Sequence, residues 1–167
     1  DFDDINVQQR IENELKRDYH IITAEKRLRQ VAHDLVEHYS TGWESGKAML
    51  VCIDKVTCVR MHKLLKKCWQ NRIDLLTSEA KHAADEQEEL FRKRQIAWME
   101  ETEMVVVISE EQNEVEKFRK WGLEEEIKEH RRLIREGFTL EDGKRIDLES
   151  AFKKPEHPFR IAIVCAM

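Results

Sequence analysis

The chain lacks the features that define several protein classes. It contains only five glycines and two prolines in 167 residues, which excludes collagen-like repeats and Pro- or Gly-rich disordered segments. No stretch approaches the roughly 20 apolar residues that a membrane-spanning helix needs, and the acidic first residues are unlike a signal peptide. These absences predict a helix-rich soluble protein of the cytoplasm that contacts no membrane.

Cysteine is too sparse and too widely spaced to indicate a zinc or redox site. No two of the four cysteines have the two-residue spacing of a metal-binding or redox pair, and each has an apolar neighbour. Buried free cysteine behaves as a small hydrophobic residue, so reduced core thiols are the better interpretation. The four are Cys52, Cys58, Cys68 and Cys165.

The charge of the chain is unevenly distributed. A net charge of -5 argues against a free-standing basic nucleic-acid binder. However, residues 54–75 carry six basic and two acidic residues, a net charge of +4, whereas residues 79–116 carry four basic and twelve acidic residues, a net charge of -8. Basic and acidic surfaces are therefore expected on different parts of the molecule.

Three short apolar runs alternate with helical patterns. Residues 48–53, 104–108 and 160–166 each read as a buried strand. Asp54 follows the first run and is the expected N-cap of a helix. The alternation predicts an α/β fold with an open, mostly parallel sheet. The first helix after a strand is expected to bury Cys58, Met61, Leu65 and Cys68 and to present Lys55, Arg60, Lys63, Lys66 and Lys67 outward.

Further helices are expected before and between the strands. Thr23 is the predicted N-cap of a helix that carries Leu28 and Tyr39 on its apolar face. Residues 80–102 predict a long helix with a dense acidic exterior. Its expected inward side chains are Leu90, Phe91, Ala97 and Trp98. A charged helix at 124–135, a tight turn at 142–143 and a short helix started by Asp147 complete the pattern.

Three apparent catalytic motifs fail on their context. Residues 42–48 have three residues between the glycines instead of four, and they precede a strand instead of following one, unlike a phosphate-binding P-loop. The pair Glu79 and His82 has no second copy of the kind that di-iron sites use. Residues 126–128 resemble the end of a nuclease motif but lie in a helical run. The chain alone is therefore expected neither to hydrolyse ATP nor to cut DNA.

Four segments resemble one known family. Residues 46–61 (GKAMLVCIDKVTCVRM) and 158–165 (PFRIAIVC) resemble the motor region of the R subunit of type I restriction enzymes, which are ATP-dependent restriction translocases. Residues 19–23 (YHIIT) resemble that family's connector into its second motor domain. Residues 106–109 (VVIS), followed by QNE at 112–114, resemble its next core strand and loop.

The resemblance implies a truncated RecA-like parallel sheet flanked by helices, with a leading helical connector. Residues 1–45 would form the connector from the first motor domain, and residues 46–167 the N-terminal part of the second, cut within helicase motif V. The parent protein would use ATP and Mg²⁺, whereas no catalytic, cofactor-binding or metal-binding residue of the family falls on this sequence. Its partners would be double-stranded DNA, the methyltransferase and specificity subunits, and the first motor domain.

The resemblance also implies where DNA is held, because translocating lobes grip backbone phosphates at strand ends. Lys55, Thr57 and Ser109 are the candidates at strand ends, and Lys63 and Lys67 are candidates on the basic helix. The alternative is that these lysines lie on an ordinary solvent-exposed helix surface that does not contact DNA. A second reading of the whole chain is a non-enzymatic α/β interaction module that docks a basic partner through its acidic helix, residues 80–102.

Overall fold

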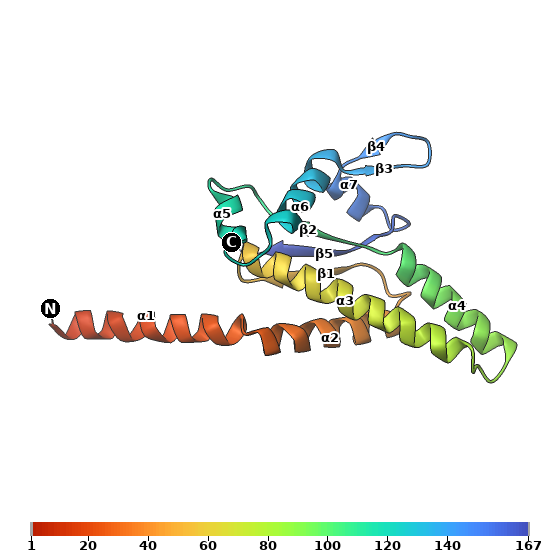
Figure 1. The fold of residues 1–167 in the computed structure, drawn as a ribbon, viewed down its shortest axis with the longest axis horizontal. Coiled ribbons are helices and arrows are strands. Elements are labelled where there is room, and N and C mark those ends of the chain that lie inside the picture. The colour runs from red at the N-terminus through yellow and green to blue at the C-terminus, as the bar shows by residue number, and fades with distance from the viewer. Residues whose placement is uncertain (1, 167) are drawn as a thin grey trace.

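The core of the molecule is a parallel sheet of three strands. The computed structural model describes residues 2–166, and it describes side chains from residue 4 onward. The strands β1 (Ala48–Cys52), β5 (Phe159–Cys165) and β2 (Glu103–Val107) lie in the order β1-β5-β2, as Figure 1 shows. The predicted α/β fold with a parallel sheet is confirmed.

Helices lead into the sheet and connect its strands. Strand β1 is joined to β2 by the two long helices α3 and α4, and β2 is joined to β5 by three shorter helices and a two-stranded hairpin. The elements are α1 (Phe2–Ile22), α2 (Glu25–Thr41), α3 (Lys55–Ala80), α4 (Glu86–Glu101), α5 (Glu114–Arg119), α6 (Glu124–Glu136), β3 (Phe138–Thr139), β4 (Arg145–Ile146) and α7 (Leu148–Lys153).

The main core lies between one face of the sheet and α3. Met61 and Leu65 of α3 are buried in one cluster with Ile161 and Ile163 of β5 and Val106 of β2. Helix α2 packs along α3 and adds apolar side chains to the same cluster. The predicted inward face of α3 is confirmed, because Cys58, Met61 and Leu65 are fully buried and Cys68 is half-buried.

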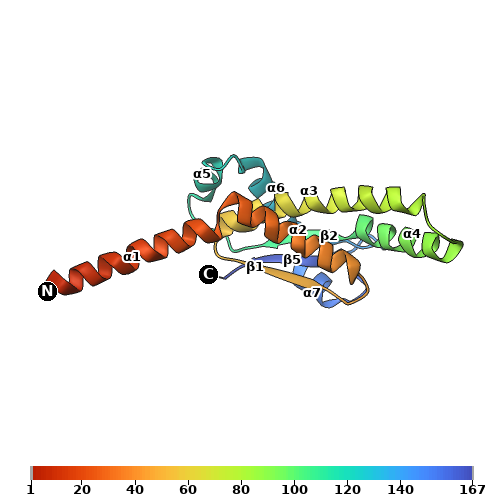
Figure 2. The same ribbon diagram turned by 90° about the horizontal axis from the view of Figure 1, so that it is seen from below.

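The second face of the sheet is only partly covered. A smaller cluster packs α7 and the hairpin against Val105, Phe159 and Ala162, and Figure 2 shows the sheet between α3 and α7. Met49 and Val51 of β1 point to this face and are each 58 % exposed. The edge strand β1 therefore presents apolar side chains to solvent on this face.

Helix α1 extends away from the rest of the molecule in both views (Figures 1 and 2). Its side chains Ile11 and Leu15 are exposed. Thr23 was predicted to cap α2, and this prediction is wrong: the N-cap is Ala24, which makes no side-chain capping hydrogen bond. Thr23 is buried, and its hydroxyl donates to the carbonyl oxygen of Tyr19 at 2.8 Å, because α1 continues up to this position.

The acidic helix expected at 80–102 is present but shorter than predicted, because α4 spans only Glu86–Glu101. Helix α3 continues to Ala80, and α4 begins only after Asp85, whose carboxylate accepts from the backbone N–H of Glu88 at 2.8 Å. Leu90 and Phe91 are 51 % and 48 % exposed instead of inward. Of the other two side chains expected inward, Ala97 is exposed and Trp98 is half-buried, while Gln95 and Met99 are buried.

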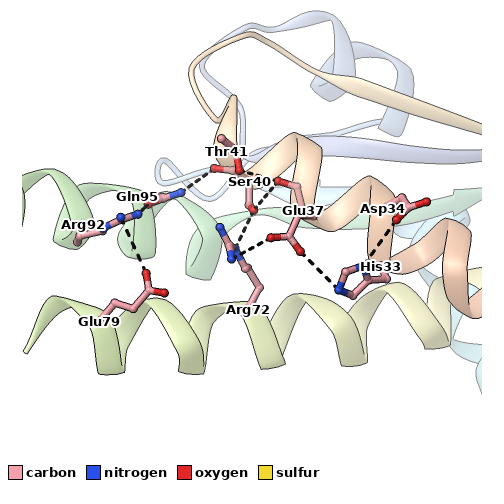
Figure 3. Close-up of polar contacts among 9 residues, drawn as sticks. All are labelled: His33, Asp34, Glu37, Ser40, Thr41, Arg72, Glu79, Arg92 and Gln95. Carbon is pink, nitrogen blue, oxygen red and sulfur yellow. Dashed lines mark hydrogen bonds and ion pairs between the residues drawn. The ribbon is translucent and has the colours of Figure 1, made fainter.

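Long-range polar contacts set the face that α4 turns inward. The side-chain amide of Gln95 donates to the carbonyl oxygen of Ser40 at 2.8 Å, and Arg72 of α3 donates to the Ser40 hydroxyl at 3.2 Å (Figure 3). Arg72 also pairs with Glu37 of α2 at 3.3 Å. These contacts join α2, α3 and α4, and no pattern of apolar spacing records them.

The remaining elements follow their local sequence signals. The turn between β3 and β4 contains Gly143 at a positive φ of 81°. Asp147 caps α7 by accepting from the backbone N–H of Ser150 at 2.8 Å. The charged helix expected at 124–135 is α6, which extends one residue further. These predictions are confirmed.

Candidate nucleic-acid interface

Two loops meet at the carboxyl ends of the parallel strands. Cys52 at the end of β1 lies opposite Cys165 of β5, and Val107 at the end of β2 lies opposite Val164. The segments that follow β1 and β2 therefore flank the end of β5. Ligands of open parallel sheets bind at this edge, and the segments place Asp54 and Ser109 there.

Asp54 organises the start of α3. Its Oδ1 accepts from the backbone N–H of Thr57 at 2.7 Å, which confirms the predicted N-cap, and the hydroxyl of Tyr19 donates to Oδ2. Burial alone would raise the pKa of Asp54, but the hydrogen bonds from Thr57 and Tyr19 outweigh it and lower that pKa. The same hydrogen bond, helped by burial, raises the pKa of Tyr19 to about 12. The carboxylate thus ties α1 to the carboxyl edge of the sheet.

Lys55 does not point outward, so that prediction is wrong. Its side chain is 10 % exposed, and its Nζ lies 2.8 Å from a carboxylate oxygen of Glu111, which follows β2. The other carboxylate oxygen of Glu111 lies 3.6 Å from Nζ of Lys117. The hydrogen bond from Lys55 and the charge of Lys117 lower the pKa of Glu111. The charge of Lys55 is therefore balanced within the site.

Thr57 and Ser109 lie near this edge in different environments. The hydroxyl of Thr57 is buried and has no hydrogen-bond partner. Ser109 has an exposed side chain, and its carbonyl oxygen accepts from Arg131 at 2.8 Å. Arg131 pairs with Glu114 as well, so α6 holds the loop after β2 in place. Ser109 is the exposed hydroxyl that a phosphate could reach.

Lys63 and Lys67 lie further along α3 on its outer surface. Lys63 is 63 % exposed and lies 3.2 Å from Glu126 of α6, and Lys67 is exposed. With about 1.5 Å of rise per residue, Lys67 lies about 18 Å along the helix from Lys55. The structure therefore brings Lys55, Thr57 and Ser109 to one edge and leaves the two other lysines on the helix face.

Arg60 does not belong to the exposed basic face, which corrects a further prediction. Its side chain is only 11 % exposed, pairs with Glu25 of α2 at 3.2 Å and lies over the ring of Trp121 at 4.4 Å. The exposed basic surface of α3 between 55 and 67 is thus reduced to three lysines, Lys63, Lys66 and Lys67.

Sequence reasoning missed the side chains that shape this edge. Tyr19 was noted only within a resembling segment, although its hydroxyl reaches Asp54 across 35 residues of sequence. Arg131 lies in a run of charged residues that gives no sign of burial, yet its side chain is 10 % exposed. Asn113 has a left-handed backbone with a φ of 57°. Asn is among the residue types that tolerate this conformation, so Asn113 was the one local signal in the sequence for the turn before α5.

Metal and membrane sites receive no support from the described residues. Residues 4–166 contain no group of three or more His, Cys, Asp or Glu side chains that could hold a metal ion. Cys52 and Cys58 are buried, and Cys68 and Cys165 are half-buried. Across the part of the chain that the structure describes, no helix combines the length and the apolar character needed to cross a membrane.

Comparisons with protein-family models, with curated proteins and with solved structures found no match for this chain.

Proposed function

We propose that this chain is part of the second motor lobe of an ATP-dependent DNA translocase, of the kind found in the R subunit of type I restriction enzymes. One observation carries the proposal. The two segments of most specific resemblance, residues 46–61 and 158–165, lie about 100 residues apart in sequence but contain the neighbouring parallel strands β1 and β5. Ala48 lies opposite Ile161 in their register. Such pairing is what a shared motor core requires.

In this proposal the chain contributes backbone contacts with duplex DNA and coupling between lobes. Lys63 and Lys67 supply exposed positive charge, and the Ser109 hydroxyl supplies a donor at the sheet edge. Phosphate contacts of this kind hold DNA without reading its sequence. Lys55 acts within the site, where its pairing with Glu111 fixes the loop after β2 against α3.

The parent protein would provide the reaction itself. ATP and Mg²⁺ would bind through residues of the first motor domain, and the methyltransferase and specificity subunits would assemble around the complex in the cytoplasm. Purified as it stands, the chain is expected to show no DNA-stimulated ATP hydrolysis, because it has no phosphate-cradling loop. Measurable DNA-stimulated hydrolysis by the chain alone would contradict this assignment.

A non-enzymatic interaction module is the second candidate, and one observation favours it. The α3–α4 hairpin extends away from the sheet (Figure 1), and α4 exposes Leu90 and Phe91 beside the acidic first turn of Glu86, Glu88 and Glu89. An apolar patch bordered by carboxylates suits a basic protein partner.

A duplex-binding measurement separates the two candidates. Fluorescence anisotropy of a labelled random-sequence duplex should show weak binding that falls steeply with salt, because each phosphate neutralised contributes about 0.9 to the salt slope. Binding by a basic protein partner together with no duplex binding at low salt would favour the interaction module.

A further inference from the structure

A pocket lies at the amino-terminal end of the sheet, opposite the candidate nucleic-acid interface. Its volume is about 430 Å³, within the range of roughly 300–1,000 Å³ found for small-molecule sites. The loop before β1, helices α4 and α7, and the start of β5 contribute its walls. The side chains used below are Trp43, Lys47, Trp98, Phe152 and Arg160, with Glu44 and Glu156 also lining the pocket.

Three aromatic rings line the pocket. Trp43 and Trp98 are half-buried, with ring centroids 5.9 Å apart, and Trp43 also packs edge-on against Phe91. Phe152 packs on Phe159 of the core, with centroids 4.9 Å apart. Packing holds these rings in place, so they form preformed apolar surfaces against which another flat ring can stack.

Three cations line the pocket, and they differ in their availability. Lys153 is exposed and pairs with Glu149 at 2.6 Å. Arg160 is paired with Glu101 and donates to the carbonyl oxygen of Trp98 at 3.1 Å and to the Thr102 hydroxyl at 2.9 Å. Its charge is already balanced, and its guanidinium lies over the Trp98 ring. An added anion would therefore gain little from Arg160.

Lys47 is the available cation. Its Nζ donates to the carbonyl oxygen of Ala151 at 3.0 Å and lies 5.2 Å from the centre of the Phe152 ring. An ammonium group has three donors, so this carbonyl occupies only one. No carboxylate among the described side chains forms an ion pair with Lys47, although the charge of Glu156 acts on it from a distance. Burial, together with the charge of Arg160, outweighs Glu156 and lowers the pKa of Lys47. The half-buried ammonium would gain from an anionic partner.

We propose that this pocket binds a flat aromatic ring carrying a single carboxylate. The ring packs among the side chains of Trp43, Trp98 and Phe152, and the carboxylate pairs with Lys47. The exposed carboxylates Glu44 and Glu156 repel ligands that carry several negative charges. The pocket is at the other end of the sheet from the candidate nucleic-acid interface, so this proposal stands independently of DNA binding.

Isothermal titration calorimetry with three matched probes tests the proposal. Indole-3-acetate supplies the ring and the charge, indole-3-acetamide supplies the ring alone, and acetate supplies the charge alone. We expect saturable binding of indole-3-acetate, with a dissociation constant of about 1 mM or tighter. We expect at least tenfold weaker binding of the other two, because each lacks one of the two contacts. Equal binding of the acid and its amide would overturn the proposed role of Lys47.

Variants of the lysine extend the test. Lys47→Met should weaken indole-3-acetate about tenfold or more, since a charge-assisted hydrogen bond is lost. Lys47→Arg retains the charge and should retain binding, and exposed Lys120→Met is the matched control, with unchanged binding. Circular dichroism verifies that each variant is folded. Absence of saturable binding of indole-3-acetate to the unmodified chain would overturn the proposal without any variant.

Discussion

Arg131 of α6 and Glu114 of α5 form an ion pair in which both side chains are almost fully buried. Nε of Arg131 donates to one Glu114 oxygen at 2.7 Å, and Nη2 donates to the other. Nη1 and Nη2 also donate to the carbonyl oxygens of Ile108 and Ser109, at 2.6 and 2.8 Å. The guanidinium thereby joins α6 to the loop that follows β2. Together with the Lys55–Glu111 pair, this side chain holds Ser109 at the sheet edge.

Arg131→Met should destabilise the protein strongly. Removing one partner of a buried ion pair leaves an uncompensated charge and costs about 3–5 kcal/mol. The neighbouring Arg132 also pairs with glutamates, but its side chain is 48 % exposed, so Arg132→Met should cost about 1 kcal/mol or less. Urea unfolding of both variants measures the difference. Similar losses in the two variants would contradict the structural role of Arg131.

Two histidines between α3 and α6 make stability depend on pH. The rings of His62 and His130 meet edge-on at 4.4 Å, and His62 contacts the carbonyl oxygen of Met104 at 3.1 Å. Burial, with smaller effects from Lys66 and, for His62, from the His130 charge, lowers the pKa of each to about 4. Both rings are therefore neutral in the folded protein at pH 7.

The lowered pKa values of His62 and His130 predict the direction in which stability changes with pH. The unfolded state, with a histidine pKa near 6.5, binds more protons than the folded state between about pH 6.5 and 4. The contribution of the two neutral histidines to the free energy of unfolding should therefore be fully present above pH 6.5. It should fall as the pH is lowered, by up to about 1.4 kcal/mol per pH unit for each histidine. Urea unfolding at several pH values should give a shallower decline for His130→Gln than for the exposed control His33→Gln. Equal declines would show that His130 is not responsible.

Asp54 should contribute to stability both as a helix cap and as the acceptor of the Tyr19 hydroxyl. Asp54→Ala removes both hydrogen bonds and should cost about 2 kcal/mol, whereas Asp85→Ala removes only the cap of α4 and should cost about 1 kcal/mol. Tyr19→Phe should speed amide hydrogen exchange in the last turns of α1, because the contact with Asp54 is lost. Unchanged exchange there would mean that the hydroxyl does not hold α1.

The local elements of the fold could be predicted from the sequence because their causes lie within a few residues. Asp54 caps α3 through a residue three positions later, and the apolar runs of the three strands are continuous. The inward face of α4 was mispredicted at Leu90 and Phe91 because the helix is held by Gln95 bonding to Ser40, 55 residues away. A contact of that separation leaves no periodic signal in the sequence.

The sequence predicted where the residues of the candidate site lie in the fold, but only some of their interactions. Lys55 and Ser109 follow strand ends, and strand ends could be located from apolar runs. The partner that neutralises Lys55 is Glu111, which comes beside it only after β2 crosses the sheet. The prediction that Arg60 points outward was wrong for a similar reason. The residues that cover it, Glu25 and Trp121, come from distant segments of the chain. Burial of charged side chains is a tertiary property.

The most direct test of the proposed function compares duplex binding by two charge-reversal variants. Lys63→Glu/Lys67→Glu reverses the exposed lysines of α3, and Lys93→Glu reverses an exposed lysine on α4 as the control. Anisotropy of a random-sequence duplex is measured over a series of salt concentrations. We predict that the double variant loses most of its affinity and about two units of salt slope, while the control is unchanged. Identical affinity and slope in all three proteins would contradict a DNA-contacting role for α3.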